Sequence, residues 1–132
     1  MQKYLFKNIQ VVNEGKIQSL DVLTNGERIE KIATRMETKY RVTELNGEGK
    51  HLFPGVIDDQ VHFREPGLTH KASIYTESKA AVAGGVTSFM EMPNTIPNAL
   101  TPQLLEDKYS IASQTSLANY SFFMGTSNDN AG

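Results

Sequence analysis

Three polar side chains alternate at the end of an apolar run that begins at Val56. They are Gln60, His62 and Arg64. Residues two apart on a strand point the same way, so the spacing predicts that all three project together from the carboxyl end of one buried strand. An imidazole beside a guanidinium there indicates a metal next to an anionic substrate. The spacing equally allows a core histidine with a surface arginine.

A second polar cluster, residues 92–95, follows the next apolar run and contains Asn94. Carboxyl ends of neighbouring parallel strands carry the chemistry in α/β barrels, which places Asn94 near Arg64. Arginine binds a carboxylate through two hydrogen bonds, and asparagine adds a donor and an acceptor. The cluster therefore predicts an anion site, although Pro-Asn is also common in ordinary turns.

The elements that would position these residues alternate between strand and helix. The patterns predict strands over 56–63, 86–92 and 118–124, a helix over 69–83 that ends at Gly84-Gly85, and a helix that begins at Thr101-Pro102. Such alternation is typical of a parallel sheet. Residues 1–52 instead predict a small β unit with a hairpin at Asn25-Gly26. We expect two domains, 1–52 and 53–132.

The length of 132 residues is too short for a whole (βα)8 barrel, which needs about 250. The chain is therefore expected to be the N-terminal part of such an α/β barrel; a small open α/β domain is the alternative. The net charge of −2 and the scattered Lys and Arg give no reason to expect nucleic acid. The sequence has no apolar run of about 18 residues, so no membrane span is expected. The absence of cysteine favours a cytoplasmic location.

Three segments of the chain resemble dihydroorotases of the amidohydrolase superfamily. Residues 54–71 are similar to their first-strand signature, 77–87 to the next helix and turn, and 91–95 to the second-strand motif. The resemblance implies a TIM barrel with a composite β-sandwich, a centre of one or two zinc ions, and interconversion of L-dihydroorotate and N-carbamoyl-L-aspartate. It further implies that His62 is a metal ligand and that Arg64 and Asn94 hold the carboxylate of this small-molecule substrate. A homo-oligomer is compatible with these expectations.

Gln60 departs from the family pattern, which has a histidine at this position as the first of two metal ligands on this strand. An amide oxygen is a weak substitute for imidazole at zinc. The alternatives are an enzyme with an altered metal centre, a non-catalytic dihydroorotase-like scaffold, or a related cyclic amidase such as an allantoinase or dihydropyrimidinase. The catalytic residues and remaining ligands of the family lie on later strands, beyond residue 132. The chain alone is thus predicted to be inactive.

Overall fold

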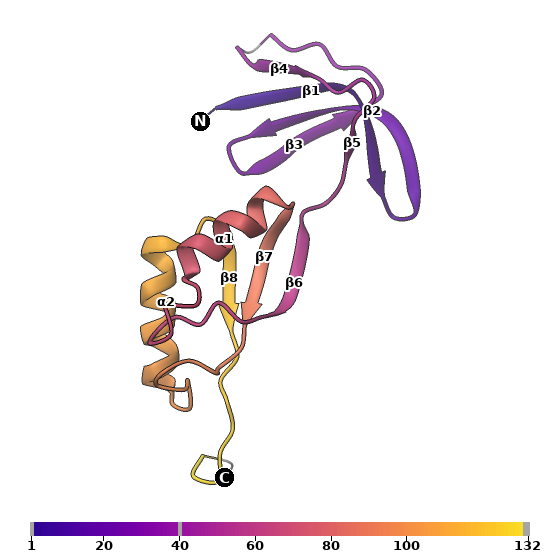
Figure 1. The fold of residues 1–132 in the computed structure, drawn as a ribbon. Helices are drawn as coiled ribbons and strands as arrows, with labels where there is room; N and C mark the ends of the chain where they lie inside the picture. The colour runs from indigo at the N-terminus through magenta and orange to yellow at the C-terminus, as the bar shows by residue number, and fades with distance from the viewer. Residues whose placement is uncertain (1, 40, 131–132) are drawn as a thin grey trace. The chain divides into compact units, whose positions relative to one another are not determined.

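A computed structural model describes residues 2–39 and 41–130 of the chain (Figure 1). The chain divides into two compact units, Met1–Pro54 and Gly55–Gly132. None of the helices in the described residues is long and apolar enough to cross a membrane.

The first unit is a five-stranded sheet. Strands β2 and β3 extend it from β1 in antiparallel fashion, while β4 and β5 both pair with β1 in parallel, so that the main order is β3-β2-β1-β4. The strands are β1 (Lys3–Asn13), β2 (Lys16–Asn25), β3 (Arg28–Ala33), β4 (Thr43–Asn46) and β5 (His51–Leu52). The β structure expected for this part of the sequence is confirmed.

Two tight turns set the register of the first three strands. Glu14 (φ 49°) and Gly15 (φ 72°) join β1 to β2, and both take the left-handed conformation. The β2–β3 hairpin is also confirmed, but its turn residues are Gly26 and Glu27, because Asn25 pairs with Arg28. Of these two turn residues, only Gly26 has a positive φ, at 58°, as in hairpins with glycine at the first turn position.

A buried aspartate accepts backbone hydrogen bonds beside the core of the first unit. Leu5, Leu23 and Met36 form this core. The Asp21 carboxylate accepts hydrogen bonds from the N–H groups of Asn8 and Met36, each at 2.8 Å. Asn8 lies where the β1–β2 register breaks and has a φ of 55°. Asp21 therefore satisfies the backbone that the bulge leaves unpaired.

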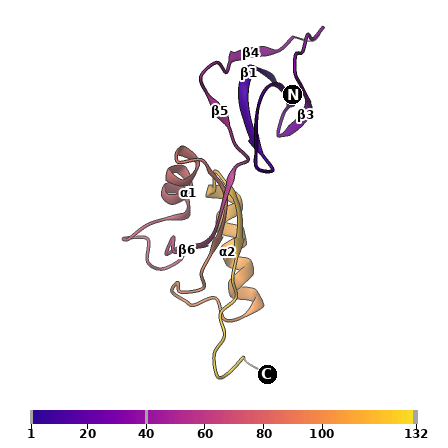
Figure 2. The same ribbon diagram turned by 90° about the vertical axis from the view of Figure 1, so that its right-hand side faces the viewer.

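The second unit has the expected alternation of strands and helices. Its strands are parallel, in the order β6-β7-β8, and α1 and α2 contact each other and the sheet (Figures 1 and 2). The elements are β6 (Val56–Val61), α1 (Ile74–Ala83), β7 (Val86–Glu91), α2 (Pro102–Thr115) and β8 (Asn119–Phe122). These are three consecutive strands of a parallel sheet with the two helices that connect them.

The core of this unit lies between the helices and the sheet. Its buried side chains are Phe63, Ile74, Phe89, Ala112 and Phe122, and the rings of Phe63 and Phe89 are 4.5 Å apart between centroids. The prediction that the first strand is buried is wrong for this chain. Val56 is 54% and Ile57 67% exposed, because β6 has β7 as its one neighbour among the described residues.

The two helices differ in how well the sequence predicted their starts. Helix α2 begins as expected, with Thr101 as its N-cap and Pro102 at the first helical position. Helix α1 begins at Ile74 rather than at residue 69, because Ser73 caps it by accepting a hydrogen bond from the N–H of Thr76 at 3.2 Å. The Glu65 carboxylate binds the Ile74 N–H at 2.8 Å and closes the same helix end.

Candidate functional site

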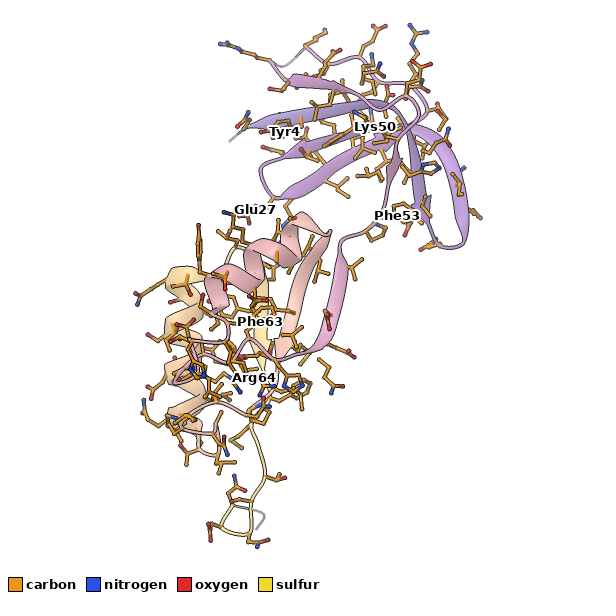
Figure 3. All side chains as sticks on the ribbon, viewed as in Figure 1. Tyr4, Glu27, Lys50, Phe53, Phe63 and Arg64 are labelled. Atoms are coloured by element: carbon orange, nitrogen blue, oxygen red, sulfur yellow. The ribbon has the colours of Figure 1, made fainter. Side chains whose placement is uncertain are left out.

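Three of the predicted site residues, Gln60, His62 and Arg64, lie around the end of β6, and Asn94 lies in the loop after β7. The strand ends at Val61. The alternation that predicted a shared direction for Gln60, His62 and Arg64 therefore stops after Gln60. Phe63 turns into the core, and Arg64 follows it with a left-handed φ of 70° (Figure 3). Within residues 2–39 and 41–130 the Arg64 guanidinium makes no hydrogen bond or ion pair. It is thus available to bind an anion.

A hydrogen bond between two exposed side chains joins the loops that follow β6 and β7. Nδ1 of His62 lies 2.9 Å from Oδ1 of Asn94. Because a carboxamide oxygen can only accept, Nδ1 carries the hydrogen, and the lone pair of the neutral ring is on Nε2. The same bond leaves the Asn94 NH₂ group free to donate elsewhere. One contact therefore orients both a metal-binding nitrogen and an anion-binding amide.

A cavity of about 670 Å³ opens at the carboxyl ends of the three strands. Gln60 and Asn94 line it, so two of the four predicted residues share one hollow. The remaining lining residues are Asp59, Met92, Pro93, Asn98, Leu100, Phe123, Met124, Gly125 and Thr126. This volume is sufficient for a small ring with a carboxylate.

Sequence reasoning missed a buried ion pair beside these loops. Glu91 ends β7 and is 0% exposed; Nζ of Lys108, 1% exposed on α2, lies 2.9 Å from its Oε2. Burial raises the pKa of Glu91, and the Lys108 ammonium and the Arg64 N–H offset only part of this rise. The sequence carries a signal for Lys108, which lies four residues after Leu104 and four before Ala112, within the apolar stripe of α2.

The described residues do not form a metal site by themselves. His62 supplies one imidazole, and Gln60 supplies an amide oxygen that zinc binds poorly. No group of three or more His, Cys, Asp or Glu in the described part of the chain can hold a metal ion. The donor set is therefore incomplete among these residues.

Comparison with known proteins shows the family of this chain. The family model described as dihydro-orotase-like matches residues 49–121, more than half of the chain. The chain belongs to the dihydro-orotase-like family. A dihydroorotase of Carboxydothermus hydrogenoformans is 46% identical over 90 residues, which are 68% of this chain and 21% of that protein. A dihydroorotase of Listeria monocytogenes is 42% identical over 104 residues, 78% of this chain and 24% of the relative.

Solved structures of related proteins share the fold of this family member. The L-hydantoinase (dihydropyrimidinase) of Arthrobacter aurescens matches with a TM-score of 0.91 and 25% identity, over 98% of this chain and 29% of its own. The D-hydantoinase of a Thermus species matches with a TM-score of 0.78 and 31% identity, over 94% and 28%. The predicted fold, the first part of an α/β barrel preceded by a small β unit, is confirmed. Its relatives named dihydroorotase and hydantoinase are cyclic amidohydrolases.

Proposed function

We propose that the whole protein to which this chain belongs is a dihydroorotase. It would reversibly hydrolyse the cyclic amide of L-dihydroorotate to N-carbamoyl-L-aspartate. The observation that carries this proposal is the family match over 49–121 with relatives named dihydroorotase at 46% and 42% identity. The chain spans about a fifth to a quarter of those relatives' length, so the activity is proposed for the whole protein.

In this proposal, the Arg64 guanidinium and the Asn94 NH₂ group form a carboxylate clamp. The guanidinium has no partner among the described residues, and the amide has its oxygen occupied by His62, so both present donors to an anion. The substrate carboxylate would accept hydrogen bonds from both. Such anchoring fixes the ring in one orientation before it reacts.

Zinc, as one or two ions, is the cofactor we propose, with His62 as a ligand through Nε2. The hydrogen bond from Nδ1 to Asn94 is the kind of support that metal-binding imidazoles receive. A bound zinc ion would polarise the amide carbonyl and supply hydroxide at neutral pH. Gln60 lines the same cavity and is at most a weak ligand, so further donors must come from outside residues 2–39 and 41–130.

Gln60 supports a second candidate, a non-catalytic dihydroorotase-like scaffold. An amide in place of imidazole weakens zinc binding. The hydantoinase names of the structural neighbours make a related cyclic amidase a third reading, to be tested with dihydrouracil and allantoin. The absence of cysteine supports the cytoplasm as the place where any of these would work.

The test is ring opening of L-dihydroorotate by the whole protein, with metal content measured on the same sample. Turnover with bound zinc supports the proposal. No turnover, little metal and no rescue by Gln60→His would favour the scaffold. Faster opening of dihydrouracil or allantoin than of dihydroorotate would favour the related amidase.

A further inference from the structure

The buried pair of Glu91 and Lys108 has no part in the chemistry proposed above. Two charges removed from water are costly, and well-packed apolar side chains stabilise a core as well or better. This pair is nevertheless enclosed, with the ammonium 4.9 Å from the centroid of the Phe122 ring. The other hydrogen bonds of Glu91 and Lys108 indicate the role of the pair.

Each charge binds the backbone of a different loop. Oε1 of Glu91 accepts a hydrogen bond from the Arg64 N–H at 2.9 Å. Nζ of Lys108 donates to the carbonyl oxygen of Met92 at 3.0 Å. The carboxylate thus holds the loop that carries Arg64, and the ammonium holds the start of the loop that carries Asn94.

The bond to Arg64 acts on an unfavourable backbone conformation. Arg64 has a φ of 70°, a region that residues with a Cβ avoid. Such a conformation persists only where its surroundings impose it. The Glu91 carboxylate, 27 residues away in sequence, is the group that accepts the N–H of this residue.

The two loops also contact each other directly. The Ile96 N–H donates to the Pro66 carbonyl at 3.1 Å, and a Cβ at Gly67 would lie 2.1 Å from the Ile96 carbonyl oxygen. Thr95, 1% exposed, donates through its hydroxyl to the Pro97 carbonyl at 2.8 Å. The loops therefore form one packed unit, held at its base by the ion pair.

We propose that Glu91 and Lys108 are positioning residues that fix Arg64 and Asn94 relative to each other and so set the affinity for the substrate carboxylate. The proposal deepens the proposed function and rests on it for the identity of the ligand. Neither residue touches substrate in this assignment. They act through the Arg64 N–H and the Met92 carbonyl.

Lys108→Met in the whole protein is the first test. Methionine keeps the length and apolar stem of lysine but loses the bonds to Glu91 and to Met92. The KM for L-dihydroorotate should rise about tenfold or more, with a smaller change in kcat, because small misplacement of a binding group is costly. Asp107→Asn is the matched control, since Asp107 is the neighbouring residue on α2 but is exposed and bonds only Gln103 among the described side chains. It should leave the KM unchanged.

A double-mutant cycle with Arg64→Ala separates positioning from general stability. If Lys108 acts through the clamp, Lys108→Met should raise the dissociation constant for dihydroorotate about tenfold in the wild-type background. In the Arg64→Ala background, the same substitution should raise it much less. Equal penalties in the two backgrounds, or a loss of kcat alone, would overturn the inference.

Deuterium exchange gives an answer that does not depend on the substrate. In folded Lys108→Met, segments 62–68 and 92–98 should exchange faster than in Asp107→Asn, with the rest of unit Gly55–Gly132 unchanged. Unchanged exchange in both segments, or a uniform rise over the unit, contradicts the inference.

A wild-type protein that neither binds nor opens dihydroorotate refutes the proposed function instead, and the exchange result then stands alone as the test of positioning. If Lys108→Met does not fold, the double variant Glu91→Gln/Lys108→Met takes its place in the kinetic and exchange measurements. This double variant leaves no unpaired charge in the core.

Discussion

The polar groups of the site are oriented by single hydrogen bonds between loops. His62 and Asn94 are 32 residues apart, and their contact at 2.9 Å assigns a role to each of their remaining polar atoms. The His62 ring presents Nε2, and the Asn94 amide presents its NH₂ group. Changes at single residues should therefore separate anion binding from metal binding.

Arg64→Ala should weaken binding of L-dihydroorotate by about 2–4 kcal/mol, because a charged partner in a desolvated site is lost. Isothermal titration with the whole protein measures this change. Dihydrouracil, which lacks the carboxylate, serves as the control ligand and should bind wild type and variant alike. Equal binding of dihydroorotate by Arg64→Ala would remove Arg64 from the clamp.

Asn94→Ala should lower zinc affinity by about 10–100-fold, as is usual when the group that orients a metal-binding histidine is lost. Competition with a chelator measures the affinity. Asn98→Ala is the control, because Asn98 lines the same cavity but, among the described residues, makes no hydrogen bond to His62. Similar zinc affinities in the two variants would mean that the His62–Asn94 bond does not support a metal ligand.

Glu91 should make stability depend on pH. Burial raises its pKa above 4.5, so the folded protein keeps this proton to a higher pH than the unfolded chain does. The resulting stability is fully present below pH 4.5 and is lost as the pH rises through the raised pKa. The advantage of wild type over Glu91→Gln should thus shrink with rising pH, by at most about 1.4 kcal/mol per pH unit. Urea unfolding at several pH values measures it, and parallel curves for the two proteins would contradict it.

Sequence could predict which residue types meet at the site, but not the bonds between them. Asn94 was expected near Arg64, because carboxyl ends of neighbouring parallel strands adjoin. The residues that line the cavity together are Asn94 and Gln60, the latter from the same strand that was to carry Arg64. The left-handed Arg64 was not expected, because strand alternation assumes extended backbone and the Glu91 acceptor is remote in sequence. A loop's course depends on such distant partners, which local pattern does not reveal.

At the scale of elements, the reliable predictions came from short sequence patterns that occur almost solely at one kind of structural position. Thr101-Pro102 marked the start of α2 because both residues favour that position. The start of α1 was predicted at residue 69, whereas the helix begins at Ile74 with Ser73 as its N-cap. Glu65 and Thr76 favour Ser73, and the Glu65 contact is not local. The loop between β6 and α1 is therefore longer than expected and packs on the next loop through Gly67.

Gly67→Ala should destabilise the protein by about 1–3 kcal/mol or more, because its φ of 83° is strained for alanine and the new Cβ would meet the Ile96 carbonyl. Gly85→Ala is the matched control. Gly85 also has a positive φ, 90°, but nothing lies within 4 Å of the Cβ position. Its cost should be about 1 kcal/mol, from conformation alone. Thermal unfolding compares the two, and equal costs would show that the loop–loop contact contributes nothing.

At the scale of the whole molecule, alternation of strands and helices correctly predicted a parallel sheet and a barrel-like fold. The three strands expected over 56–63, 86–92 and 118–124, and with them an incomplete barrel, are also confirmed. β6 and β8 each have one strand neighbour among the described residues. Apolar side chains remain exposed beside them, including Ile57 at 67%, Leu117 at 55% and Met124 at 49%. In a barrel, further strands would close both edges.

The isolated 132-residue chain should therefore self-associate through β6. Unpaired strand edges that carry apolar side chains recruit other chains. Ile57→Lys should weaken this association by about tenfold or more, because burying an unpaired ammonium in an apolar contact costs more than about 1.4 kcal/mol. Sedimentation velocity over a range of concentrations measures the effect. Val82→Lys is the control, because Val82 is 43% exposed but lies on helix α1 and not on a strand. Equal weakening by the two substitutions would point to general repulsion between charged chains, and a wild-type chain that stays monomeric would show that the open edge of β6 is protected in some other way.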